Sequence, residues 1–462
     1  MRRFLASSVG VTCAAALALP LALPDPAQAR APAVTAEPAV PGSTQSLPLV
    51  PLAGTRSLGP AASEQGLPRR DVRSFSLVGV VWDNPNSELH GHVQVRTRDA
   101  GTTHWSGWQD VETHYSDDAA DLDSAERASG HVRGATAPLW VGASDGVEVR
   151  VQAELAEGDE RAGATADSPL PRGLHLELVD PGADPPRAGT RRAEPTGGTS
   201  VVEAAAADAL NTEPVDAAAA NAGLAPLGAT EIPALTKQQT ERDPATQELL
   251  AAQGSRQRAQ PYIGPRPRII TRRGWGADEN LRERGFVYTK KVKAAFVHHT
   301  ASGNKYRCSQ APSVIRSIYR YHVESSGWRD IGYNFLVDKC GNIYEGRAGG
   351  VAKPVMGAHT LGFNTNSMGI AVLGSYGATK PTSAALKAIA RLTAWKLGLY
   401  GANPRGKTYL KSGGGNLYRK GKNVRLNVIS GHRDGFATEC PGRLLYGKLG
   451  SARRTAARYQ GR

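Results

Sequence analysis

The sequence lacks a long apolar run beyond its first 29 residues, and it contains little cysteine and few aromatic residues. Without such a run, the rest of the chain offers no candidate membrane span. Four cysteines and an aromatic content of 6% among 462 residues are compatible with two modest hydrophobic cores and unstructured segments beside them. We therefore expect two folded domains.

Residues 1–29 have the pattern of a secretory signal peptide. A short basic start at 1–3 precedes an apolar run at 9–23, which is too brief to span a bilayer and is interrupted by a proline. The small residues at 27–29 form a cleavage site. The arginine pair loosely resembles a twin-arginine signal, but the general secretory route is favoured, and the protein is expected to be secreted or associated with the cell wall.

The scarce cysteines limit what disulfides can form. Cys13 leaves with the signal peptide, so Cys308, Cys340 and Cys440 remain in an oxidising environment, and three cannot all pair within one chain. Cys308 precedes an expected helix and Cys340 lies in a turn, which makes a disulfide between them plausible, although another pairing or an intermolecular bridge stays open. Cys440 would then lie outside the pair, eight positions from His432.

The N-terminal half predicts an all-β domain. Over residues 75–180, apolar and polar residues alternate with period two between turn signals, as in half-buried antiparallel strands of a small β-sandwich. Residues 30–74 are expected to be disordered. The domain's tryptophans favour core positions over a sugar-stacking platform. Wall anchoring and a simple spacer both remain open as its function.

Residues 181–264 are rich in alanine, proline and glycine and are expected to form a flexible linker. Such a segment cannot bury enough apolar surface to offset the entropy of ordering it.

Residues 265–462 form the second predicted domain, which contains few acids. Residues 266–462 hold 35 lysines and arginines against 9 acidic residues. For an exported protein this excess favours carboxylate-bearing wall peptides or anionic wall polymers as partners, rather than nucleic acid; a generally solvated basic surface is the alternative. The chain is expected to be a monomer.

Strand and helix patterns interleave in this domain, which predicts an α/β fold with a mixed sheet. Strands are expected at 292–299, 333–337, 343–347 and 369–376, and helices at 311–324 and 381–400.

Two adjacent histidines end the first of these strands. His298 and His299 should point to opposite faces, so only one of them can face a given pocket. A catalytic zinc needs three protein ligands from histidine, cysteine or carboxylate and one open position, and His298, His432 and Cys440 could supply the three. A structural role for a strand histidine stays open. A thiol peptidase built on Cys440 and His432 is disfavoured by the proline after the cysteine.

Seven ordered motifs extend across residues 266–450. They are RRGWGA (272–277), VHHT (297–300), GWRDIGYNFLVD (327–338), IYEGR (343–347), GAHT (357–360), GHRD (431–434) and TECPG (438–442). In order and spacing they resemble the peptidoglycan recognition protein family, which includes bacterial zinc N-acetylmuramoyl-L-alanine amidases.

The resemblance implies a Zn²⁺ enzyme that cleaves the amide between N-acetylmuramic acid and L-alanine in peptidoglycan. It makes His298, His432 and Cys440 the zinc ligands and gives Tyr333 and Thr438 catalytic roles in stabilising the oxyanion. Thr438 stands where some relatives have lysine. A catalytically idle wall receptor of the same fold is the rival interpretation, and the retained cysteine argues against it.

The resemblance also implies which residues bind the stem peptide. Gly327, Trp328 and Arg347 are similar to residues of relatives that prefer diaminopimelate, whose extra carboxylate an arginine could bind in bidentate geometry. His359 resembles a residue of the substrate groove, or is a turn histidine. Asp434 is expected either to orient a ligand histidine or to pair with its neighbour Arg433.

Overall fold

The structure is a computed structural model that describes residues 42–52, 64–113, 118–154, 170–184, 215–252 and 262–462. The predicted signal peptide and Cys13 lie outside these residues. Among the described residues, every helix is too short or too polar to cross a bilayer.

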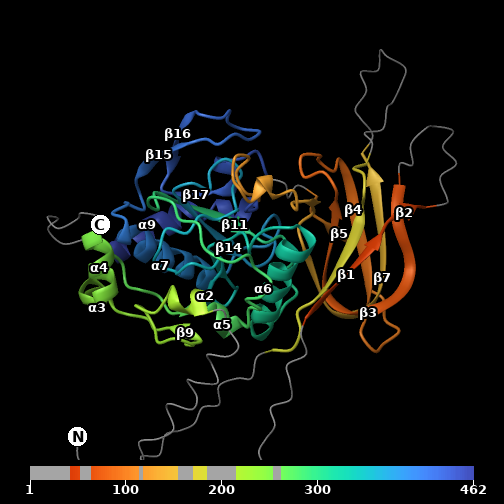
Figure 1. Ribbon diagram of the computed structural model, residues 1–462, viewed down its shortest axis with the longest axis horizontal. Coiled ribbons are helices and arrows are strands. Elements are labelled where there is room, and N and C mark those ends of the chain that lie inside the picture. Colours follow the sequence, from red (N-terminus) through yellow and green to blue (C-terminus); the bar gives the residue numbers. More distant parts are fainter. Residues whose placement is uncertain (1–41, 53–63, 114–117, 155–169, 185–214, 253–261) are drawn as a thin grey trace, which may run out of the picture. The chain divides into compact units, whose positions relative to one another are not determined.

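An all-β domain occupies the first part of the described chain. Its elements are β1 (Ser43–Pro48), β2 (Val50–Pro51), β3 (Glu64–Trp82), β4 (Gly91–Asp99), β5 (Gln109–Val111), the short helix η1 (Arg127–Ser129), β6 (Gly134–Ala135), β7 (Leu139–Ala153) and β8 (His175–Asp180). The strands pair antiparallel in the order β1-β8-β3-β7-β4-β5 (Figure 1), with β2 and β6 also on β3. Valines and leucines at alternate positions of β3, β4, β7 and β8 fill one core, as the period-two pattern predicts.

The β domain begins earlier than predicted. Residues 30–74 were expected to be disordered, yet β1 pairs with β8 from Ser43 to Pro48 and β3 begins at Glu64. The reason is that pairing does not need a strongly apolar strand: β1 supplies main-chain hydrogen bonds along β8 while Leu47 packs against the core. Of the tryptophans, Trp82 is fully buried.

The C-terminal domain is built on a seven-stranded mixed sheet. Its strands are β9 (Glu231–Ile232), β10 (Ile269–Ile270), β11 (Ala294–His299), β12 (Phe335–Val337), β13 (Ile343–Glu345), β14 (Ser367–Val372) and β17 (Ile429–Gly431), in the order β17-β11-β14-β12-β13-β10-β9. β11 runs parallel to both neighbours, and β12 and β13 form the predicted antiparallel hairpin. A separate hairpin joins β15 (Lys407–Lys411) to β16 (Asn423–Asn427).

Helices cover both faces of this sheet (Figure 1). The helical elements are α2 (Val215–Ala219), α3 (Lys237–Arg242), α4 (Pro244–Ala252), α5 (Arg272–Trp275), η2 (Cys308–Gln310), α6 (Ala311–Arg320), η3 (Tyr321–Ser325), α7 (Ser383–Leu399), η4 (His432–Asp434), α8 (Arg443–Tyr446) and α9 (Leu449–Gln460). Successive side chains of β12 and β14 alternate between a core under α6 and a core under α7 and α9. The predicted α/β class is confirmed.

Part of the predicted linker is ordered. Residues 185–214 and 253–261 lie outside the described residues, but α2, β9, α3 and α4 occupy residues 215–252, so the expectation of a flexible segment is wrong there. β9 extends the sheet by pairing with β10, and Ile232 is fully buried in the main core. A few apolar side chains are enough to order residues 215–252, because they pack on the C-terminal domain, which has a core of its own.

Candidate functional site

His298 lies at the carboxyl end of β11, an interior strand next to the edge strand β17, and is fully buried. Its Nδ1 lies 3.8 Å from Cys440 Sγ, and its Nε2 lies 3.3 Å from Thr360 Oγ1. A threonine hydroxyl can accept the Nε2 proton, which leaves the lone pair of Nδ1 for a metal. Burial, aided by the neighbouring His299, holds the pKa of His298 well below its ordinary value, so the imidazole is neutral.

His432 and Cys440 reach the same point from the neighbouring strand. His432 begins η4 directly after β17, which runs parallel to β11, so both histidines lie at the same edge of the sheet. Their ring centroids are 4.3 Å apart. The Cys440 sulfur accepts the backbone N–H of His299 at 3.4 Å, and the N–H of Cys440 donates to Thr438 Oγ1 at 3.1 Å.

The three predicted ligands therefore converge. Ligand atoms of His298, His432 and Cys440 all lie within 4.8 Å of one another, and all three residues are buried. Two imidazoles and a thiol are a donor set that zinc prefers, so the residues present fit the metal that the resemblance implies. Cys308 and Cys340 form the predicted disulfide, with their Cα atoms 6.2 Å apart, which leaves Cys440 to this cluster.

A carboxylate that the sequence did not reveal lies among these residues. Asp118 follows β5 of the β domain, and its Oδ1 is 3.0 Å from Nδ1 of His298 and 3.4 Å from Nδ1 of His432. Its Oδ2 accepts a hydrogen bond from the hydroxyl of Tyr333 at 2.9 Å. Burial raises the pKa of Asp118 to about 6, against the opposing effect of His432 and the tyrosine. Tyr333 thus lies beside the cluster of His298, His432 and Cys440.

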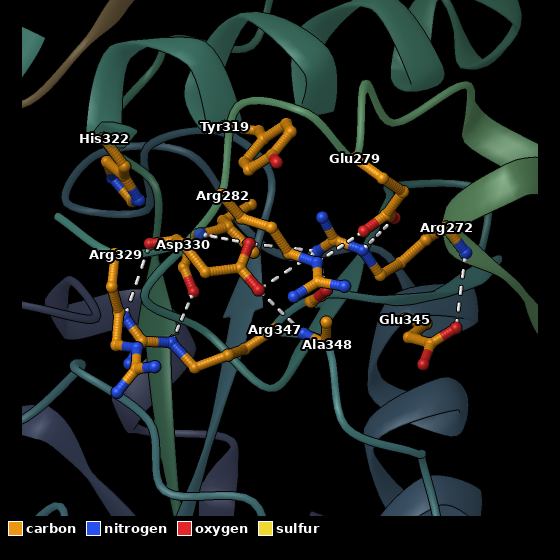
Figure 2. Close-up of polar contacts among 12 residues, drawn as sticks. Arg272, Glu279, Arg282, Tyr319, His322, Arg329, Asp330, Glu345, Arg347 and Ala348 are labelled. Atoms are coloured by element: carbon orange, nitrogen blue, oxygen red, sulfur yellow. Dashed lines mark hydrogen bonds and ion pairs between the residues drawn. The ribbon is translucent and has the colours of Figure 1, made fainter. Parts of the chain in front are cut away.

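Arg347 is held in place by a buried network beneath the site. Figure 2 shows Asp330 between the loop of Arg347 and Arg272; its carboxylate accepts from the Arg272 guanidinium at 3.0 Å and from the N–H of Ala348 at 2.8 Å. The Nε of Arg347 donates to Ile331 O at 2.9 Å. With its backbone and Nε fixed, the guanidinium has a defined direction.

The end of that guanidinium binds a carboxylate of the β domain. Nη1 and Nη2 of Arg347 donate to the two oxygens of Glu126 at 2.8 and 2.9 Å. The two side chains are 5% and 3% exposed. Burial alone would lower the pKa of Arg347, but the Glu126 carboxylate raises it above its ordinary value. Arg347 is therefore built for bidentate binding of a carboxylate.

The remaining predicted site residues fall into two groups. Trp328 stacks on His322 with centroids 4.3 Å apart, and Gly327 before it has a positive φ of 72°. Both border the surface that carries Arg347. His359, predicted as a groove residue, is instead fully buried, and its Nδ1 lies 3.0 Å from the Thr360 hydroxyl. It supports the residue that orients His298.

Asp434 takes neither of its expected roles. Its Oδ2 accepts the N–H of Gly431, and its Oδ1 accepts the hydroxyl of Tyr446 at 2.6 Å. Arg433 pairs with Glu439 instead. Asp434 thereby stabilises the backbone turn that contains His432.

Sequence reasoning missed Asp118, Glu126 and Thr360. Thr360 is the last residue of the GAHT motif, so the sequence did carry a local signal for it. For the two acids the available signal was charge: residues 118–126 contain four acids, in a chain whose C-terminal domain is strongly basic. Their separation from Arg347 and His298 along the chain exceeds 170 residues, so no local pattern could pair them.

Both folded parts of this chain are similar to known protein families. Residues 288–443 match the model of the N-acetylmuramoyl-L-alanine amidase family, and residues 26–172 match that of the Rv3811 N-terminal galactose-binding domain-like family. Peptidoglycan-recognition protein SC2 of Drosophila melanogaster is 35% identical over 183 residues, which cover 39% of this chain and 84% of that protein. N-acetylmuramoyl-L-alanine amidase of Homo sapiens is 36% identical over 145 residues, which cover 30% and 24%.

A solved structure of peptidoglycan recognition protein LE in complex with tracheal cytotoxin is 33% identical, covers 40% of this chain and 92% of that chain, and has a TM-score of 0.31. The Drosophila SC2 relatives are covered over 84% of their length, and the ordered motifs occur in the domain that matches them. This chain belongs to the peptidoglycan-recognition protein and N-acetylmuramoyl-L-alanine amidase family.

Proposed function

We propose that this chain is a secreted, zinc-dependent amidase that hydrolyses the bond between N-acetylmuramic acid and the L-alanine of the peptidoglycan stem. The observation that carries the proposal is the buried cluster of His298, His432 and Cys440, whose ligand atoms lie within 4.8 Å of one another. A receptor that only binds the wall has no need of a buried thiol beside two buried imidazoles.

The chain's own residues orient the reaction. Zinc, when bound, supplies the Lewis acidity that activates water and polarises a carbonyl. Thr360 holds the imidazole of His298 with Nδ1 directed to the cluster. The hydroxyl of Tyr333 points into the same pocket, where it can donate to the oxygen that becomes negative as the amide carbonyl is attacked. Thr438 is half-buried beside Cys440, whose N–H its hydroxyl accepts, and it is proposed as a further donor to this oxygen.

The substrate is proposed to be peptidoglycan of the diaminopimelate type. Arg347 supports this because its guanidinium, fixed from below by Ile331 O, takes a carboxylate through two hydrogen bonds. A lysine-type stem offers no carboxylate at that position. Substitution of Arg347 by alanine should reduce kcat/KM on diaminopimelate-type stems more than on lysine-type stems; equal losses on both would remove this preference.

The experiment that tests the function measures metal and product together. Purified protein should contain one zinc per chain, and incubation with diaminopimelate-type muropeptide should release a stem peptide with a new L-alanine amine, detected by mass spectrometry. Chelation should abolish the release and zinc should restore it. Cys440→Ser should lower both zinc content and release. Protein that holds zinc and binds muropeptide up to saturating concentration, yet never releases the stem, would be a receptor.

A further inference from the structure

A single segment of the β domain covers the whole proposed site. We define it as the inner segment, residues 118–133, which runs between β5 and β6 and contains η1. It contacts the metal cluster at one end and the surface of Gly327 and Trp328 at the other. Four of its side chains are acidic, in contact with a domain that has a large basic excess.

At the metal end, the position of Asp118 fits a fourth ligand. In a tetrahedral zinc site with bonds of 2.0–2.3 Å, neighbouring donor atoms are roughly 3.3–3.7 Å apart. Asp118 Oδ1 lies 3.0 Å from His298 Nδ1 and 3.4 Å from His432 Nδ1, and His298 Nδ1 lies 3.8 Å from Cys440 Sγ. Asp118 Oδ1 thus lies at the spacing of a shared coordination sphere from the Nδ1 atoms of both histidines.

The other oxygen of Asp118 is bound to the hydroxyl of Tyr333, the proposed oxyanion donor. Oδ2 accepts the hydroxyl of Tyr333 at 2.9 Å, so one carboxylate reaches both the metal position and the tyrosine. A carboxylate resembles the anion that forms when hydroxide adds to an amide carbonyl, because both carry one negative charge and two oxygens on one carbon. Asp118 therefore occupies the place of the bond to be cleaved.

The other anchor is Glu126, eight residues further on. It fills the bidentate position of Arg347, and its Oε1 also accepts the N–H of Arg329 at 3.2 Å. This is the position that the proposed function gives to the diaminopimelate carboxylate. Because the pair is almost fully buried, water is excluded from it, and a substrate carboxylate can enter only when Glu126 leaves.

The residues between and beyond these anchors follow the same surface. Asp121 accepts the N–H of Gly362 and the side-chain amide of Asn364, both at 2.8 Å. Further on, the backbone oxygen of His131 approaches Gly327 so closely that a Cβ on Gly327 would be only 1.9 Å from it. Val132 packs on Trp328. Every substrate residue predicted at the surface is thereby covered.

We propose that the inner segment is a built-in ligand of this site: Asp118 is a fourth zinc ligand and Glu126 stands in for the stem-peptide carboxylate, so that segment and muropeptide compete. The inference rests on the proposed function for the identity of the muropeptide. Catalytic zinc requires an open position, and four protein ligands leave none. The structure thus corresponds to a resting form, which substrate or another event must open.

The test uses the full chain and three variants. Asp118→Ala and Asp118→Asn remove the fourth ligand, the second without changing side-chain shape, and Glu126→Gln removes the charge at Arg347. Asp110→Asn is the matched control, because Asp110 is an exposed acid on β5 that bonds Gln94, outside the inner segment.

Two readouts do not depend on catalysis. The cobalt-substituted chain should show a spectrum of four protein ligands, and Asp118→Ala and Asp118→Asn should shift its visible bands and lower zinc affinity about 10- to 100-fold. Diaminopimelate-type muropeptide should bind zinc-free Asp118→Ala and Glu126→Gln at least tenfold more tightly than wild type. Asp110→Asn should match wild type in both.

Hydrolysis is the third readout. Where zinc is saturating, both Asp118 variants should raise kcat/KM at least tenfold. Unchanged cobalt bands together with unchanged muropeptide affinity in both Asp118 variants would overturn the inference. Tighter muropeptide binding and shifted bands without any hydrolysis would uphold the inner segment as a ligand and reject the amidase function instead.

Discussion

At the scale of single residues, zinc affinity should depend on Thr360, which touches no metal. Its hydroxyl lies between Nε2 of His298 and Nδ1 of His359 and fixes which nitrogen of His298 faces the cluster. Thr360→Val keeps the shape and removes the hydroxyl, so zinc affinity should fall about 10- to 100-fold. Competition with a chromophoric chelator measures it.

Thr360→Ser supplies the control for this prediction, because it retains the hydroxyl and should recover most of the affinity. A valine variant with wild-type zinc affinity would show that packing alone orients His298.

Stability should depend on pH partly through His322. Burial, with a smaller effect of Arg347, lowers its pKa from 6.5 to about 3. The unfolded chain therefore binds more protons between pH 6.5 and pH 3, and the free energy of unfolding falls as the pH is lowered through this window, by up to about 1.4 kcal/mol per pH unit from this group.

His322→Gln should reduce that slope relative to wild type, measured by urea unfolding of metal-free protein at several pH values. Other buried histidines titrate in both proteins, so the difference between the two slopes isolates His322. Parallel slopes would contradict the prediction.

The sequence predicted the three candidate metal ligands but not the two acids that contact the site. The difference is that the ligands stand in recognisable motifs and the acids do not. His298, His432 and Cys440 stand in short motifs whose spacing along neighbouring parallel strands brings them together. Asp118 and Glu126 stand in another domain, in a segment with no regular period. The role of the inner segment is revealed by its contacts in the folded chain, with Tyr333, His298 and Arg347.

At the scale of elements, the same distinction explains the predicted linker. Local composition marked 181–264 as unable to form its own core, yet β9 needs only an exposed edge of an existing sheet. The strands with strong local patterns, β11 and β14, lie within two residues of their predicted starts. Elements that are ordered by packing on another part of the fold cannot be predicted from their own local sequence.

Residues 215–252 should therefore contribute to the stability of the C-terminal domain. Ile232 of β9 is fully buried among the residues of the main core. Ile232→Ala should lower the free energy of unfolding by about 2–4 kcal/mol, through lost burial and the cavity left behind. Denaturant unfolding measures the loss.

Leu227→Ala is the matched control nearby, because that side chain is 54% exposed, and it should change stability by less than about 0.5 kcal/mol. Equal small effects of both substitutions would mean that residues 215–252 rest on the domain without stabilising it.

At the scale of the whole molecule, the β domain and the C-terminal domain share a core. Leu77, Trp140 and Val179 of the first belong to one buried cluster with residues of α6. The hydroxyl of Tyr321 donates across this contact to Thr136 O at 3.0 Å. Docking of the domains and placement of the inner segment are therefore linked, since β6 follows the segment directly.

Loosening that docking should release the site. A Cβ on Gly79 of β3 would lie 2.3 Å from the Tyr321 hydroxyl, so Gly79→Val separates the domains there while valine suits a strand. Backbone amides of residues 118–133 should then exchange hydrogen faster, at least tenfold, and muropeptide hydrolysis should rise. Gly107→Val is the control, because a Cβ there meets no atom within 4 Å. Faster exchange without a rise in hydrolysis would show that movement of the inner segment does not control activity. Unchanged exchange would show that the segment is held by its own contacts with Arg347 and the metal cluster rather than by the docking of the domains.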